Sequence, residues 1–215
     1  MNKYDFYISL GPNCIPAFHL KNMKLRKEAL PFDWMLLNHM EGIDYINNLI
    51  LTNFDNYLKD LIYNEKNKVI SKHYPKMVFF HHDLILNVSH TISKYDENNK
   101  DKLIDIFKRR ANRFQDIIKM DKKILFIYAL PLSSYKKSNN LELEMFWKSI
   151  NFFMNIIGKK ELLLLIYNDK DFNLDENFNN ININRLYIKK FIKNVQISKL
   201  WGDSKDWINM FIDFI

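Results

Sequence analysis

Short, continuous apolar runs alternate along this chain with longer segments whose apolar residues recur every three or four positions. The runs at residues 4–10, 123–130 and 162–167 are β-prone, and each ends at a glycine, proline or asparagine. A last strand is expected at residues 185–188. Strands that are apolar throughout are typical of a parallel sheet buried on both faces. We therefore predict an α/β fold, doubly wound, with a three-layer, mostly parallel sheet and helices on both faces; an α+β fold is the alternative.

Amphipathic helices are expected between these strands. Residues 100–119 carry apolar residues at spacings of three and four, and Asn99 supplies a cap. Residues 141–157 show the same periodicity and end at Gly158, a residue type that often closes helices. The other expected elements are a helix that follows an Asn13 cap, helices at residues 40–50 and 54–63, strands at residues 68–70 and 77–80, a polar loop at 168–184, and a terminal helix capped near Asp203 or Ser204.

The composition fits one domain that spans residues 1–215. A chain of 215 residues with 47% hydrophobic residues can bury a sizeable core, and 15% aromatic residues argue against disorder. The first residues hold no apolar signal-peptide segment, and no apolar run approaches the roughly 20 residues that span a bilayer. A single cysteine suits a reducing compartment. We therefore expect a cytoplasmic protein without a membrane span.

Charge and motif content narrow the range of ligands. The net charge of +7 comes mainly from scattered lysines, and no basic stripe with interleaved aromatic residues is found, so nucleic-acid binding is not expected. The dinucleotide, P-loop and metalloprotease signatures are missing, and one cysteine cannot make a zinc finger. We expect neither a cofactor nor a metal, and a substrate that is a small molecule, a peptide or a glycan.

The turn after the first predicted strand is the best candidate for a functional site. In open α/β sheets ligands bind at the carboxyl ends of strands, and here that position holds Gly11, Pro12, Asn13 and Cys14. A thiol at a helix N-terminus meets the positive end of the helix dipole and unpaired backbone N–H groups, which stabilise a thiolate or an oxyanion. The alternative is that Cys14 is a small buried apolar residue, as free cysteines often are.

A thiol nucleophile needs a base, and the chain has six histidines. His81 and His82 follow a predicted strand and precede Asp83, although packing in the core is an alternative role for both. His19 is expected on the surface, facing away from Cys14.

Arg109, Arg110 and Arg113 form a basic cluster on the helix predicted at residues 100–119. Such a cluster usually faces solvent, but Arg110 or Arg113 could bind a phosphate or carboxylate if it turned toward the end of the sheet. At residues 201–204 a helix cap is the expected role, and contact with a sugar is the alternative.

Several ordered blocks carry a family resemblance. They are Ser-Leu-Gly-Pro-Asn-Cys at residues 9–14, Ala-Phe-His-Leu at 17–20, Leu-Arg at 25–26, Pro-Phe-Asp-Trp at 31–34, His-Asp at 82–83, Arg-Arg-Ala-Asn-Arg-Phe at 109–114 and Trp-Gly-x-x-x-x-Trp at 201–207. Together they resemble a microbial and viral family described as papain-like cysteine peptidases, and they span most of the chain. This resemblance makes the alternative fold a papain-like α+β fold. The glutamine that precedes the catalytic cysteine of true papain-like enzymes is not found here.

The resemblance implies a cysteine-dependent hydrolase with Cys14 as nucleophile and His82 as general base. Asp33, Asp83 or Asp203 would orient the histidine, and Asn13 could donate to the oxyanion. The expected substrate-binding residues are Asn13, Trp34, Asp83, Arg110, Arg113 and Asp203. Two other functions stay open for the same turn: a transferase or esterase that acts on surface glycans or sugar phosphates, and a binding domain in which Cys14 and Trp34 belong to the core.

Overall fold

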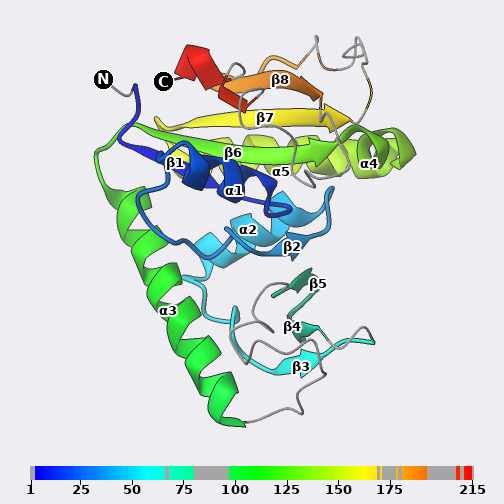
Figure 1. Ribbon diagram of the computed structural model, residues 1–215. Coiled ribbons are helices and arrows are strands. Elements are labelled where there is room, and N and C mark those ends of the chain that lie inside the picture. The colour runs from blue at the N-terminus through cyan, green and yellow to red at the C-terminus, as the bar shows by residue number, and fades with distance from the viewer. Residues whose placement is uncertain are drawn as a thin grey trace.

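The computed structural model describes residues 3–65, 68–79, 97–168, 170, 178, 181–192, 207–208 and 211–214. Two four-stranded sheets organise this part of the chain (Figure 1). The first is parallel, in the order β1 (Phe6–Ser9), β6 (Ile124–Pro131), β7 (Glu161–Asn168) and β8 (Leu186–Ile192). The second is antiparallel, in the order β2 (Leu36–Leu37), β5 (Tyr74–Val78), β4 (Val69–Ser71) and β3 (Leu61–Tyr63).

The parallel sheet is buried on both faces, which confirms the predicted α/β class. Side chains alternate along β6, so that Phe126 and Tyr128 join one hydrophobic cluster while Leu125 and Ile127 join another. Both faces therefore need an apolar cover. This requirement explains why the central strands are apolar throughout instead of alternating with polar residues.

Helices cover both faces of the sheet, so that the sheet and the helices on its two sides form three layers. α2 (Gly42–Leu51), α3 (Glu97–Lys119) and α5 (Asn140–Ile157) contribute residues to the larger cluster, which continues into the antiparallel sheet through Leu61 and Met77. On the other face α1 (Ile15–Asn22) packs with Trp207, Phe211 and Phe214, of which the last ends a 3₁₀ turn at Ile212–Phe214. A short helix, α4 (Leu132–Lys137), directly follows β6. None of the described helices is both long and apolar enough to cross a membrane.

The four parallel strands lie in chain order. Among the described strands the order does not reverse, so the prediction of a doubly wound sheet is wrong on this point. All amino ends of the strands meet at one edge of the sheet and all carboxyl ends at the opposite edge (Figure 1). The turn that follows β1 therefore lies at the carboxyl edge, beside the ends of β6 and β7.

Several local predictions need correction. The helix expected at residues 54–63 is a series of turns followed by β3, because Asn53 and Phe54 adopt left-handed φ angles of 49° and 61° that end α2. α1 is capped by Cys14 and not by Asn13. α3 begins at Glu97, before the predicted Asn99 cap.

The later predictions are mostly confirmed. α5 begins with a capping box between Asn139 and Glu142 and ends at Gly158, whose φ of 65° suits a glycine. α4 was not predicted. Of the expected terminal helix, Asp203 and Ser204 lie outside the described residues, while Trp207, Ile208 and Phe211 are helical.

Candidate functional site

The turn after β1 is held by backbone hydrogen bonds to two other strands, β6 and β2. The backbone carbonyl of Gly11, which has a φ of 84°, accepts the Ala129 N–H of β6 at 2.9 Å. The carbonyl of Pro12 accepts the Leu37 N–H at 2.7 Å. A Cβ atom at position 11 would lie only 3.4 Å from the Leu37 side chain, so the turn and β2 pack closely. These contacts fix the backbone that leads into Cys14.

Asn13 braces this turn through both the oxygen and the nitrogen of its side-chain amide. Its Oδ1 accepts the Ile15 N–H at 3.0 Å, and its Nδ2 donates to the Tyr167 hydroxyl at 2.9 Å. Tyr167 lies at the end of β7, so this bond spans the carboxyl edge across β6. One of the two N–H groups of the amide that we expected to donate to an oxyanion is therefore bound to Tyr167.

Cys14 is the N-cap of α1 and is 8% exposed. Burial raises the pKa of its thiol to about 11, and a hydrogen bond from the residue's own backbone N–H lowers the pKa by less. The predicted placement at a helix N-terminus is confirmed. The loss of hydration nevertheless outweighs the stabilisation expected there, and the resting side chain is a neutral thiol.

Asp33 is fully buried in the connector between α1 and β2. Its Oδ2 accepts the Leu30 N–H at 2.9 Å and pairs with Arg26 Nη1 at 3.2 Å. Burial raises the pKa of the carboxyl to about 6, although the Leu30 N–H and the charges of Arg26 and Arg110 oppose the shift. Trp34 is half-buried, and the Arg26 guanidinium lies over its ring at 5.7 Å. These contacts hold the connector together.

The two arginines singled out on α3 face this connector. Arg113 Nη1 donates to the Ala29 carbonyl at 2.9 Å and pairs with Glu28 at 3.1 Å. Arg110 lies over the Phe107 ring at 5.0 Å, and burial lowers the pKa of its guanidinium while the charge of Asp33 opposes the shift. Arg110 Nη1 is buried without a hydrogen-bond partner among the described residues.

The base predicted for Cys14 cannot be placed. His81, His82, Asp83 and Asp203 lie outside the described residues. The prediction that His19 lies on the surface is wrong: it is fully buried, and its ring stacks on Trp207 at 4.3 Å with an interplanar angle of 13°. The reason is that α1 turns this side chain toward the C-terminal aromatic residues that share its layer.

One contact between a serine and a histidine was not predicted. Ser134 Oγ, in α4, lies 3.2 Å from His39 Nδ1, in the loop between β2 and α2. The Tyr128 hydroxyl donates to the His39 carbonyl at 2.8 Å, which anchors this loop to β6. Burial lowers the pKa of His39, so its ring is neutral at physiological pH. The rule that placed Cys14 at the end of a strand could also have drawn attention to Ser134, because it follows the strand predicted at residues 123–130.

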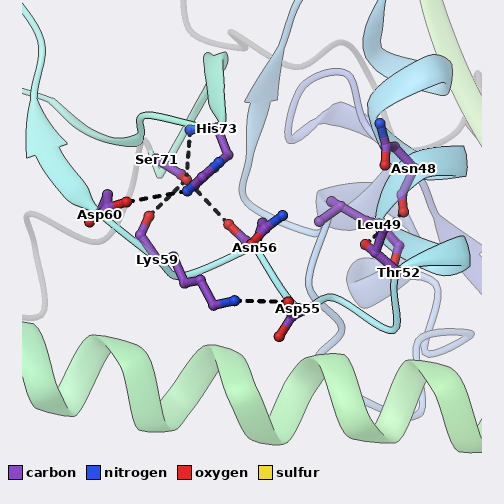
Figure 2. Close-up of polar contacts among 9 residues, drawn as sticks. All are labelled: Asn48, Leu49, Thr52, Asp55, Asn56, Lys59, Asp60, Ser71 and His73. Atoms are coloured by element: carbon purple, nitrogen blue, oxygen red, sulfur yellow. Dashed lines mark hydrogen bonds and ion pairs between the residues drawn. The ribbon is translucent and has the colours of Figure 1, made fainter.

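A serine, a histidine and an aspartate also lie close together at the antiparallel sheet (Figure 2). The Ser71 hydroxyl donates to the carbonyls of Lys59 and Asn56, at 2.9 and 3.3 Å, and accepts the His73 N–H at 3.3 Å. His73 Nε2 meets the Asp60 carboxylate at 3.2 Å instead of the serine. The histidine therefore cannot take the serine proton in this arrangement, and the group stabilises the turn before β3.

No group of three or more histidine, cysteine, aspartate or glutamate side chains in the described ranges could hold a metal ion. The arrangement at the carboxyl edge instead offers a buried thiol on a braced turn, with a neutral histidine on the neighbouring loop. Such groups suit attack on a carbonyl carbon when a base removes the thiol proton.

Comparison with known proteins gives a family and one distant relative. The family model described as "Putative papain-like cysteine peptidase (DUF1796)" matches residues 5–161. The "Uncharacterized protein R408" of Acanthamoeba polyphaga mimivirus is 24% identical over 235 residues, which cover 96% of this chain and 97% of that protein. No solved structure matches the chain.

Proposed function

Because the chain belongs to the family described as "Putative papain-like cysteine peptidase (DUF1796)", we propose that it hydrolyses acyl bonds through Cys14. The thiol sulfur attacks the carbonyl carbon of a peptide or ester while a base takes its proton, which forms a tetrahedral intermediate. The base then gives this proton to the leaving amine or alcohol, whose bond to the carbonyl carbon breaks and leaves a thioester on Cys14. Water then hydrolyses the thioester. The observation that carries the proposal is the position of Cys14 on a braced turn at the carboxyl edge of a parallel sheet.

The high pKa of Cys14 bears on how the nucleophile is activated. With a pKa of about 11, only a minute fraction of the thiol is ionised at neutral pH. We therefore propose that the base removes the proton during the attack, instead of holding a thiolate at rest. His82 is the proposed base on the family resemblance, and His39 is the competing candidate because burial keeps its ring neutral.

Acyl-enzyme formation tests the proposal directly. The wild-type protein is mixed with a panel of activated peptide and p-nitrophenyl esters, quenched in acid and analysed by peptide mass spectrometry. We expect an acyl group on Cys14, and its loss in Cys14→Ala. The chain holds a single cysteine, so a thioester adduct is assigned without ambiguity. Turnover without any adduct, and unchanged in Cys14→Ala, would refute the proposal.

Two matched variants identify the base. His82→Gln and His39→Gln each replace one imidazole by a neutral amide of comparable length. If His82 is the base, His82→Gln abolishes acylation while His39→Gln retains it. The reverse result assigns the role to His39 and leaves Cys14 as nucleophile.

A glycan transferase or esterase that relies on the arginines of α3 has less support. Arg113 already binds the Ala29 carbonyl and Glu28, so its guanidinium is used within the protein. Activity that survives Cys14→Ala but is lost in Arg113→Ala would favour that alternative.

The single cysteine, which suits a reducing compartment, supports a cytoplasmic place of action.

A further inference from the structure

The parallel topology gathers lysines that are scattered in the sequence. Strand register pairs Phe6 with Ile124, Leu125 with Glu161 and Leu162 with Leu186. The segments that precede these strands therefore lie side by side along the amino edge, opposite the edge that holds Cys14 (Figure 1). Backbone bonds tie them together, from Asp5 N–H to the Lys123 carbonyl at 2.8 Å and from Leu162 N–H to the Arg185 carbonyl at 3.1 Å.

This amino edge is basic. Residues 3–5, 120–123, 158–161 and 184–185 bring together six cationic side chains and three carboxylates, which leaves a net charge of +3. The cationic residues are Lys3, Lys122, Lys123, Lys159, Lys160 and Arg185. We call this group the basic edge.

The carboxylates of the basic edge are largely used locally. Asp5 accepts the backbone N–H of Lys123 at 3.0 Å, and Glu161 accepts a hydrogen bond from the Tyr4 hydroxyl. Asp121 is the third carboxylate and is exposed.

The lysines of this edge are available to an external partner. Lys122, Lys123 and Lys159 are exposed, and Lys160 is half-buried. Within the described part of the chain, none of these four ammonium groups forms an ion pair. Their ammonium groups are therefore available to an external anion, and the edge keeps the net charge of +3 counted above.

Apolar side chains are exposed where two helices approach the same edge. Met120 directly follows α3 and is 42% exposed, and Phe152 in the last two turns of α5 is 46% exposed. A lysine-rich surface flanked by exposed apolar side chains matches the chemistry of an anionic lipid bilayer: phosphate and carboxylate headgroups attract the ammonium groups, and the apolar side chains enter the interface. Nucleic-acid sites, in contrast, depend more on arginine forks and stacked aromatic rings.

We propose that the basic edge docks the protein peripherally on an anionic lipid surface, through its lysines Lys122, Lys123, Lys159 and Lys160 and the neighbouring Met120. The carboxyl edge, which carries the turn with Cys14, then faces away from the bilayer. This proposal does not depend on the reaction at Cys14, because it concerns the opposite edge of the sheet.

Vesicle co-sedimentation of the full chain tests the proposal. One set of vesicles contains phosphatidylcholine alone, and the other contains equal parts of phosphatidylcholine and phosphatidylserine. We expect binding only to the anionic vesicles, and a loss of that binding as salt is raised. Each lysine near an anionic surface contributes about a fivefold gain in partitioning, so Lys122→Gln/Lys123→Gln should weaken binding on the order of 30-fold. Lys159→Gln/Lys160→Gln should have a comparable effect.

The matched control is Lys136→Gln/Lys137→Gln on α4. These two exposed lysines lie near the carboxyl edge, and their replacement changes the net charge by the same amount. We expect this control to bind almost as well as the wild-type protein. Equal losses in the control and in Lys122→Gln/Lys123→Gln would overturn the proposal, because binding would then follow net charge alone. Equal binding to both kinds of vesicle, or tighter binding to single-stranded RNA than to anionic vesicles, would also overturn it.

Discussion

Burial favours the neutral form of the two titratable side chains that matter most for the proposed site. The pKa of the Cys14 thiol rises to about 11 because its thiolate would lose hydration, and the first turn of α1 does not compensate. Asp33 gains an arginine and a backbone N–H as partners, yet its pKa still rises to about 6. For both residues, desolvation exceeds the favourable electrostatic contacts.

The alkylation rate of Cys14 reports its pKa. Below pH 10 the thiolate fraction of a group with a pKa of about 11 rises roughly tenfold for each pH unit. We therefore expect the rate of alkylation by iodoacetamide to rise about tenfold for each pH unit between pH 7 and pH 10, or roughly 1000-fold in all, in the free protein. Cys14→Ser is the control and should take up no label at this position. A rate that is already constant near pH 7 would contradict the prediction, and would indicate an imidazolium partner.

Asp33 makes the free energy of unfolding depend on pH in the mildly acidic range. Its pKa is higher in the folded protein than the ordinary value of 3.8, so the folded state binds the proton more tightly. The resulting stabilisation is complete below about pH 4 and is lost as pH rises through about 6, by roughly 3 kcal/mol at most. Urea unfolding at several pH values should show this fall in the wild-type protein relative to Asp33→Asn. Parallel pH profiles for the two proteins would contradict it.

At the scale of single elements, the carboxyl edge depends on close contact between α2, the loop before it and β6. Gly42 begins α2, and its N–H donates to the Asn38 carbonyl at 2.8 Å. A Cβ atom at this position would meet the Tyr128 hydroxyl at 2.5 Å and Leu37 Cβ at 3.1 Å. The same Tyr128 hydroxyl holds the His39 carbonyl, so this contact also sets the position of the His39 loop.

Gly42→Ala should therefore destabilise the protein by about 1–3 kcal/mol through overpacking, as measured by chemical unfolding. Tyr128→Phe removes the hydroxyl that the new methyl group meets, and alone should cost about 1 kcal/mol through its lost hydrogen bond. In the double variant the two losses should not add, because the main clash is gone. Additive losses would show that Leu37, and not Tyr128, limits the space.

At the scale of the whole molecule, long-range polar contacts join elements that are far apart in the chain. Asn13 connects the turn after β1 to the end of β7, and Arg113 connects α3 to the connector that carries Asp33. The larger hydrophobic cluster runs from the parallel sheet to the antiparallel one. The turn that carries Cys14 is thus held by segments from both halves of the chain.

Arg113 and Arg109 provide a matched test of this role. We expect Arg113→Gln to lower the free energy of unfolding by about 1 kcal/mol, because a charged donor to the Ala29 carbonyl is lost while the partly exposed pair with Glu28 adds little. Arg109→Gln removes the same charge from an exposed position on the same helix and should change stability only slightly. Equal effects of the two variants would assign the change to net charge instead of to the contact.

Periodicity and turn residues were sufficient to predict the α/β class, the parallel strands, α3, α5 and the Cys14 turn, because these depend on local conformation and on which faces are apolar. The ordered motifs were sufficient to indicate the family. Burial of Cys14 and His19, the partners of Asp33 and Arg113, and the contact of Ser134 with His39 were decided only by the tertiary structure. Each depends on residues brought together from distant parts of the chain, and local sequence patterns do not show which distant residues come into contact. For the same reason, lysines that look scattered in the sequence form one basic edge only when parallel strands align their amino ends.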